Sequence, residues 1–217
     1  MNYIVIDLEY NQFFDFKKEW QSPPNPILPL EIIQIGAIKL DENLKIIGDF
    51  DATIRPKLYR TLNPYVARVT HLTNHELRNS PAFSKVYSDL KKFIGNNKTT
   101  LCFWGNDDMR TLIRNILFLS QDISGLPLEY INIQRIASTY LNVPAKQQLS
   151  LSYVVSSLAI DAPLTFHNAV NDAYYTAKIF QKVSSQALGL NIHSFDYNGF
   201  LSQFLTQIEK PKKRNKK

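Results

Sequence analysis

The first part of the chain contains three apolar runs that predict β-strands. Residues 3–9, YIVIDLE, are apolar until their acidic end, and residues 32–40, IIQIGAIKL, are almost continuously apolar, as in a buried central strand. Asp41-Glu42-Asn43 predicts a turn into a third strand at about residues 44–55. Because no helical pattern separates these runs, we expect an antiparallel meander. Residues 10–30 contain four prolines and predict a long loop.

Helical periodicity dominates the rest of the chain. Ser80-Pro81 predicts the start of a helix that ends at Gly95. Residues 99–104 and 128–133 predict a fourth and a fifth strand. Further helices are expected at about residues 107–119, 134–142, 149–159 and 167–185, the last with Ala169, Ala173 and Ala177 on one face. This order predicts an α/β fold with a mixed five-stranded sheet, in which parallel strands follow the meander and helices cover both faces.

The composition is typical of one soluble globular domain. The chain has 217 residues, of which 44% are hydrophobic and 20% charged. The first apolar run is too short for a signal peptide, and no stretch reaches the roughly 20 apolar residues that span a bilayer. The single cysteine, Cys102, excludes an internal disulfide and a thiolate metal cluster. We therefore expect a buried, reduced thiol, a cytoplasmic location and no membrane partner.

The net charge of +6 is concentrated at the C-terminus. The last eight residues, KPKKRNKK, hold six Lys or Arg and no acid, which leaves residues 1–209 with equal numbers of basic and acidic residues. We expect a domain over residues 1–189 and an extension outside the core over residues 190–217, ending in a flexible basic tail. The tail either contacts a polyanion such as nucleic acid or serves only as a solvated, disordered end.

Two carboxylates end the first strand on the same side. Asp7 and Glu9 are two positions apart, so their side chains point to one face of the sheet. Neighbouring carboxylates repel each other and are costly to remove from water, so a bound cation would stabilise them. The alternative is that the strand reaches the surface here and both acids are solvated.

Three further polar residues occur where the expected helices begin. Asp108 and its neighbour Asp107 follow Trp104-Gly105, at a helix start where acids also favour the cap and the helix dipole. His167 and Asp172 are five residues apart at the start of the final helix. Each group alone is compatible with a purely structural role.

Together, the four carboxylates and the imidazole predict a two-metal phosphodiester nuclease. Carboxylate oxygens are hard ligands that suit Mg²⁺ or Mn²⁺. Two such ions, about 3.5–4 Å apart, can stabilise both the attacking and the leaving oxygens of a phosphodiester. A neutral imidazole can take a proton from the attacking water near neutral pH. We therefore expect two divalent metal ions, Mg²⁺ or Mn²⁺, as cofactors.

The same segments resemble the DEDDh 3′–5′ exonucleases, the superfamily of ribonuclease T and the DNA polymerase III epsilon subunit. The resemblance spans residues 3 to about 185 and rests on IVIDLEYN, EIIQIGAIKL, VTHLTNHELRNSPAF, FWGNDDMRTLI and HNAVNDAYYTAKIF. Its most similar branch is that of the KapD-like and enhanced-RNAi exonucleases. The resemblance implies a ribonuclease H-like fold, two divalent metal ions and release of nucleoside 5′-monophosphates from 3′ ends.

The resemblance also implies roles for the five residues. Asp7, Glu9 and Asp172 would hold one metal ion. Asp7 would also touch the second ion, which Asp108 would reach directly or through water. His167 would be the general base. The family's third acid stands three residues after the glycine, which favours Asp108 over Asp107.

Further positions match residues with which the family holds the 3′-terminal nucleotide. These positions are Leu8, Tyr10, His71 and Leu72. Tyr10 or Trp104 could also stack on a base, with packing in the core as the alternative. Gln34 stands where relatives often have an acid, and we interpret Glu31 as structural.

The expected partner is the 3′ end of single-stranded nucleic acid, with RNA favoured over DNA. A DNA-directed proofreading or repair exonuclease is the main alternative, because no residue indicates a contact with the ribose 2′-hydroxyl. A third reading is a non-catalytic nucleic-acid-binding adaptor, which the intact set of five residues argues against. The sequence does not indicate the oligomeric state.

Overall fold

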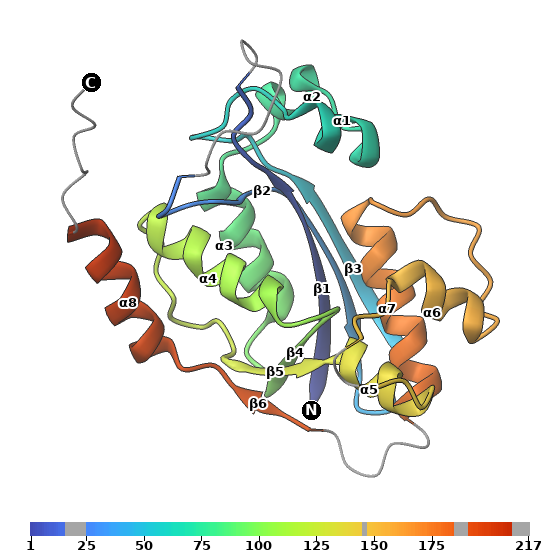
Figure 1. The fold of residues 1–217 in the computed structure, drawn as a ribbon. Coiled ribbons are helices and arrows are strands. Elements are labelled where there is room, and N and C mark those ends of the chain that lie inside the picture. Colours follow the sequence, from blue (N-terminus) through green and yellow to red (C-terminus); the bar gives the residue numbers. More distant parts are fainter. Residues whose placement is uncertain (16–24, 145–146, 185–190, 210–217) are drawn as a thin grey trace.

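The computed structural model describes residues 1–15, 25–144, 147–184 and 191–209 (Figure 1). A mixed six-stranded sheet in the order β3-β2-β1-β4-β5-β6 has helices packed on both faces. The strands are β1 (Asn2–Asn11), β2 (Glu31–Leu40), β3 (Ile46–Thr53), β4 (Thr99–Phe103), β5 (Glu129–Asn132) and β6 (His193–Ser194). The first three form the expected antiparallel meander, and β4 and β5 continue the sheet in parallel with β1. The predicted α/β fold is therefore confirmed, with one strand more than expected.

Eight helices are present in the described residues. They are α1 (Pro64–Thr70), α2 (Asn74–Asn79), α3 (Phe83–Ile94), α4 (Asp107–Phe118), α5 (Ile133–Tyr140), α6 (Leu151–Ser157), α7 (Ala169–Ser184) and α8 (Tyr197–Glu209). The short helices α1 and α2 have no counterpart in the sequence-based prediction, because six or seven residues give little periodicity. Caps stabilise both: the Asn63 side chain accepts from the Tyr65 N–H, and Thr73 and Glu76 form a capping box.

The alternation of side chains along β1 separates two hydrophobic cores. Ile4, Ile6 and Leu8 belong to the first core, which α3 and α4 cover. Tyr3 and Val5 point to the opposite face and belong to the second core, under α5, α6 and α7. Because side chains alternate along a strand, Asp7 and Glu9 continue the row of Tyr3 and Val5 on the α7 side. The strand thus carries its apolar pattern up to the point where the carboxylates begin.

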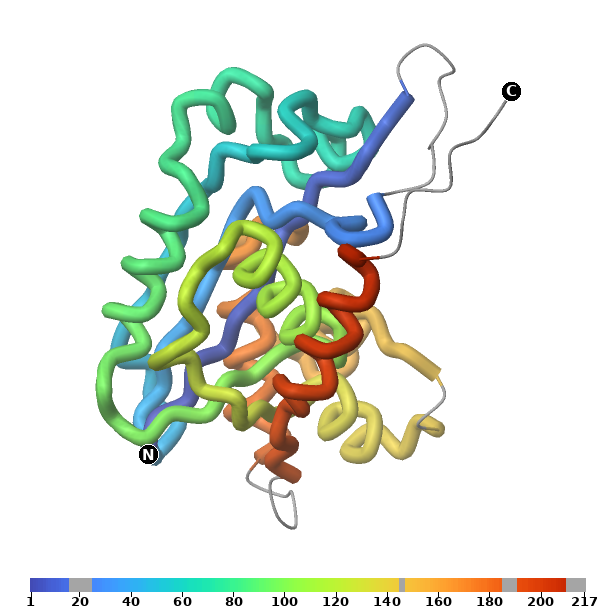
Figure 2. Tube along the Cα trace, turned by 90° about the vertical axis from the view of Figure 1, so that its left-hand side faces the viewer, coloured from blue at the N-terminus to red at the C-terminus, as the bar shows by residue number. Residues whose placement is uncertain are grey.

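The C-terminal segment differs from the predicted extension outside the core. β6 pairs with β5 at the edge of the sheet, and Phe195 and Phe200 are buried in the first core. Helix α8 lies along α4 (Figure 2), where the Arg114 guanidinium stacks on the Phe200 ring and donates to the Gln207 side chain. Residues 191–209 are therefore part of the packed domain. The short strand was missed because two residues carry no readable pattern.

Other predictions concern the termini and the single thiol. Cys102 is fully buried and free, as expected. No helix in the described ranges is both long enough and apolar enough to cross a membrane. The basic tail at residues 210–217 and much of the predicted long loop, residues 16–24, lie outside the described residues.

Candidate active site

Three of the predicted carboxylates meet at the end of β1. Asp7 and Glu9 point from β1 toward the first turn of α7, which carries Asp172. One oxygen atom of each carboxylate lies within 4.8 Å of the others. Asp172 is 8% exposed, and its Oδ1 atom has no hydrogen-bond partner in the described residues. A buried carboxylate oxygen without a hydrogen-bond partner, close to two other acids, would be stabilised by a bound cation.

The start of α7 is held in place by two residues of β2. Gly36 pairs with Asp7, and the backbone of Ala169 lies directly against it: a Cβ atom built on Gly36 would be 2.1 Å from the Ala169 carbonyl carbon. Gln34 pairs with Glu9, and its side-chain oxygen accepts from the Ala169 N–H at 3.4 Å. The partners of the β1 acids in β2 thus determine where Asp172 sits. The small residues Ala169, Ala173 and Ala177 are all fully buried in this packing, as their spacing predicted.

His167 lies just outside α7, two residues before the helix begins, and not within it as the sequence suggested. Its backbone has a left-handed φ of 62°, and its N–H donates to Asp172 Oδ2 at 3.0 Å. That φ is uncommon for a residue other than glycine and is fixed here by the carboxylate. The imidazole is exposed, and its charge acts on the Asp172 carboxylate. The ring thus lies beside the acids and is open to solvent.

Asp108 approaches the site from the first turn of α4. The Tyr10 hydroxyl, at the end of β1, donates a short hydrogen bond to Asp108 Oδ1. Asp108 is half-buried, and its charge acts on both Asp7 and Glu9. Its neighbour Asp107 is exposed. The structure therefore places Asp108 beside the other acids, although it lies outside the group of three whose oxygens are within 4.8 Å of one another.

The pKa values of all four acids are raised above their ordinary values. Burial is the largest cause for each, and repulsion from neighbouring acids adds to it for Asp7, Glu9 and Asp108. The pKa of Glu9 rises from 4.5 to about 7, and those of Asp108 and Asp172 rise from 3.8 to about 6. The pKa of Asp7 rises well above its ordinary value. Three hydrogen bonds oppose these shifts: from the Leu8 backbone N–H to Asp7, from Tyr10 to Asp108 and from the His167 N–H to Asp172. The site therefore concentrates negative charge that a cation would stabilise.

These residues fit divalent metal ions of the oxygen-preferring kind. The donors are carboxylates, which Mg²⁺ and Mn²⁺ favour. Asp7, Glu9 and Asp172 would hold one ion, and the free Oδ1 atom of Asp172 offers a ligand. Asp7 and Asp108, which interact electrostatically, would hold a second.

The residues predicted to hold the substrate have different surroundings. The Leu8 side chain is buried in the first core, so only its backbone can contact a ligand. Leu72 packs on a small core next to α1, while His71 is exposed in a left-handed conformation at the end of that helix. Trp104 packs on the second core, and its indole N–H donates to the Leu149 carbonyl. Tyr10 holds Asp108, so its hydroxyl has a role at the acidic cluster that the stacking hypothesis did not include.

Three residues of β2 support the site or the loop beside it, and the sequence analysis assigned a structural role to one of them. Glu31 is structural, as expected: its carboxylate accepts from the N–H groups of Lys57, Leu58 and Tyr59. Gly36 was not recognised, although a glycine within a strand of β-branched residues signals a close backbone approach. Gln34 was noted only as a departure from relatives, yet it orients α7.

Comparisons with known proteins agree with this geometry. A family model of the ribonuclease T type, described as "Exonuclease", matches residues 4–180. The probable 3′-5′ exonuclease KapD of Bacillus subtilis is 22% identical over 182 residues, covering 83% of both chains. The DNA polymerase III subunit epsilon of Treponema pallidum is 27% identical over 172 residues, covering 76% of this chain and 74% of that protein.

A solved structure also shares the fold. The nuclease domain of 3′hExo, a DEDDh family member bound to rAMP, superposes with a TM-score of 0.75 at 20% identity. The match covers 89% of this chain and 96% of that domain. The family model covers most of the sequence, including every member of the acidic cluster. The chain therefore belongs to the exonuclease family; its sequence is similar to that of a probable 3′-5′ exonuclease, and its fold is similar to that of a DEDDh nuclease.

Proposed function

We propose that this protein hydrolyses the 3′-terminal phosphodiester bond of single-stranded nucleic acid, with RNA favoured, and releases nucleoside 5′-monophosphates. The observation that carries the proposal is the meeting of Asp7, Glu9 and Asp172, with carboxylate oxygens within 4.8 Å, beside Asp108 and His167. When bound, two divalent metal ions, Mg²⁺ or Mn²⁺, supply Lewis-acid stabilisation of the phosphate and of the attacking water.

The chain's own residues then have separate tasks. Asp7, Glu9 and Asp172 would hold one ion, and Asp7 and Asp108 would hold the other. Tyr10 fixes the orientation of Asp108 through its hydroxyl. The His167 imidazole, exposed at the edge of the cluster, accepts the proton of the attacking water and passes it to solvent. The 3′-terminal nucleotide would lie near the exposed His71 and the backbone of Leu8.

RNA is the favoured substrate because a protein of similar fold binds a ribonucleotide. The 3′hExo domain was solved with rAMP, a ribonucleotide. The second candidate is DNA, since the epsilon subunit belongs to a DNA polymerase and is slightly more identical to this chain than KapD is. The two substrates differ at the 2′-hydroxyl, which no residue of the site identifies. We further propose that the basic tail strengthens binding to either polyanion through phosphate contacts.

The proposal is tested with single-stranded RNA and matched DNA, each labelled at the 3′ or the 5′ end. Incubation with Mg²⁺, Mn²⁺ or EDTA should give metal-dependent shortening from the 3′ end, faster for RNA. The matched control is Asp7→Asn, which removes one charge from the cluster and should abolish cleavage without unfolding the chain. Faster trimming of DNA would reassign the substrate. Binding without cleavage of either would favour the adaptor reading.

A further inference from the structure

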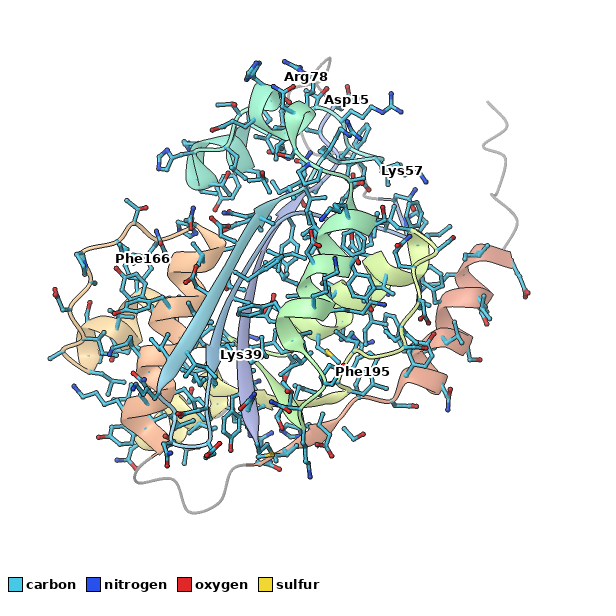
Figure 3. The ribbon with its side chains drawn as sticks, turned by 180° about the vertical axis from the view of Figure 1, so that it is seen from behind. Asp15, Lys39, Lys57, Arg78, Phe166 and Phe195 are labelled. Carbon is cyan, nitrogen blue, oxygen red and sulfur yellow. The ribbon has the colours of Figure 1, made fainter. Side chains whose placement is uncertain are left out.

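A cavity of about 680 Å³ lies away from the acidic cluster, between the loop that follows β3, the end of α2 and the start of α3. Four basic side chains line it: Arg55, Lys57, Arg60 and Arg78. All four residues are exposed, and none forms an ion pair with an acid of the described ranges. In Figure 3, Arg78 on α2 and Lys57 on the loop project near the same end of the sheet. We call this cavity the basic cleft.

The one acid that lines the basic cleft does not neutralise these cations. Glu31 is 2% exposed, and its carboxylate accepts main-chain N–H groups from Lys57 and Tyr59 at 2.6 and 2.7 Å. The carboxylate is thus occupied in fixing the loop that carries Lys57 and Arg60. Four cations face one buried, fully bonded acid, so the rim carries a net positive charge. Such a rim attracts anions.

The backbone of the basic cleft is fixed. The Arg55 N–H donates to the Pro81 carbonyl at 2.9 Å, which joins the end of β3 to the segment before α3. Helix α3 begins at this wall, and its N-cap residue, Ala82, provides no side-chain hydrogen bond. The unpaired N–H groups of the first turn add partial positive charge to that of the side chains. The backbone that carries Arg55 is therefore held by a hydrogen bond, so little backbone freedom is lost there on binding an anion.

Helix α4 connects the basic cleft to the acidic cluster. Asp108 lies in its first turn, and Leu119, its C-cap residue, lines the cleft. Eleven residues at 1.5 Å per residue separate the two by about 16 Å. At about 3.4 Å per nucleotide, the axial spacing of a strand in duplex DNA, this corresponds to at most about five nucleotides, and a more extended single strand spans it with fewer.

We propose that the basic cleft binds the phosphodiester backbone of the substrate strand, several nucleotides upstream of the 3′ end held at the acidic cluster. This inference rests on the proposed function, because that function makes the substrate a polyanion with its 3′ end in the site. Lys and Arg contacts to phosphates are independent of base sequence and depend on salt. The basic cleft would therefore make affinity depend on the length of the strand and not on its sequence.

The test compares a double variant, Arg55→Gln with Arg78→Gln, with a control, Lys45→Gln with Lys98→Gln. The control removes two exposed lysines from the opposite end of the sheet, beside β3 and β4. Binding of single-stranded oligonucleotides of about three and about ten nucleotides, lengths on either side of the estimated spacing, is measured in EDTA with the full chain. We expect the cleft variant to weaken binding of the longer strand only. Its salt dependence, the slope of log K against log[salt], should fall by about 1.4, for two lost phosphate contacts.

Several outcomes would overturn the inference. These are an unchanged salt slope, an equal loss for both lengths, or an equal effect of the control variant. Competition with inorganic phosphate separates the sources of the anion: if phosphate binds at the basic cleft while length dependence is unchanged, the cleft is a small-anion site and the strand is not its ligand. The single variants Arg55→Gln and Arg78→Gln, each expected to lower the slope by about 0.7, keep the test valid if the double variant unfolds. Failure of the wild type to cleave the short strand with Mg²⁺ or Mn²⁺ would refute the proposed function separately.

Discussion

Gly36 and Ala169 are in direct backbone contact, and this contact positions the acidic cluster. A Cβ atom on Gly36 would lie 2.1 Å from the carbonyl carbon of Ala169 and from the nitrogen of Val170. Gly36 is paired with Asp7, and Ala169 begins the helix that carries Asp172 three residues later. The distance between these two acids therefore depends on the absence of a side chain at position 36.

Replacement of Gly36 by alanine should disrupt both stability and activity. The added methyl group meets backbone atoms, which cannot rotate away, so α7 must shift from β2. Overpacking of this kind costs about 1–3 kcal/mol, and a shift of Asp172 would weaken metal binding. Thermal unfolding with and without Mg²⁺ measures both effects.

The matched control for this substitution is Gly48→Ala in β3. There the new Cβ atom would lie 3.4 Å from a side-chain carbon of Phe93, which is an ordinary contact. We expect this variant to keep wild-type stability and cleavage. A Gly36→Ala protein that behaves like Gly48→Ala would show that the close approach has no functional role.

Substitution of the two neighbouring acids at the start of α4 should affect the cleavage rate very differently. Asp108 is half-buried beside Tyr10 and the β1 acids, whereas Asp107 is exposed. Asp108→Asn should lower kcat by more than the roughly 10–100-fold that loss of a supporting residue at a metal site typically costs. Asp107→Asn should stay near wild type. Cleavage rates at saturating metal measure both effects. A large loss in Asp107→Asn with near wild-type rates in Asp108→Asn would show that Asp107 is the metal-binding acid of this helix.

Tyr10 offers a test of how Asp108 is tuned. Burial raises the pKa of Asp108 to about 6, and the hydrogen bond from the Tyr10 hydroxyl keeps it from rising further. In Tyr10→Phe this pKa should rise further, so a larger fraction of Asp108 is protonated in mildly acidic buffer. The acidic limb of the pH–rate profile should move to higher pH, with a larger loss of rate at pH 6 than at pH 8. A rate lowered equally at all pH values would indicate a role in substrate contact instead.

The fold and the five candidate residues could be anticipated because both depend on local signals. The apolar run that ends in Asp7 and Glu9 gives the strand, the face and the carboxylate pair at once. His167 and Asp172 could be associated through their position before and within one helix. The alternation of β1 accounts for the two cores, since Val5 and Ile6 have buried side chains on opposite faces.

The parts that were missed depend on contacts between distant segments. The Tyr10–Asp108 bond joins residues 98 positions apart, and Gln34 reaches Ala169 across 135 positions. No spacing within one element reveals such pairs. The edge strand β6 was missed for a similar reason: His193 and Ser194 form a strand only because β5 offers them an open edge. Phe195 and Phe200 carried the only signal, as large apolar residues in a segment interpreted as an extension.

The raised pKa values predict how the metal-free protein responds to pH. Glu9 has a pKa of about 7 in the folded state against an ordinary 4.5, and Asp172 about 6 against 3.8. The folded state therefore binds more protons than the unfolded state between about pH 4 and pH 7, and its stability falls as pH rises through this window. In EDTA, we therefore expect a higher melting temperature at pH 5.5 than at pH 7.5.

Divalent metal should reverse this trend. Ligands must be deprotonated to bind, so Mg²⁺ or Mn²⁺ should raise the melting temperature more at pH 7.5 than at pH 5.5. Repulsion from Asp108, Asp172 and Glu9 raises the pKa of Asp7, and Asp7→Asn removes this repulsion. This variant should melt higher than wild type in EDTA at pH 7.5, and added metal should stabilise it less. If metal stabilises wild type and variant equally, the ions bind elsewhere and the cluster is not the metal site. If the variant melts lower than wild type in EDTA, repulsion among the four acids is not what limits the stability of the metal-free protein.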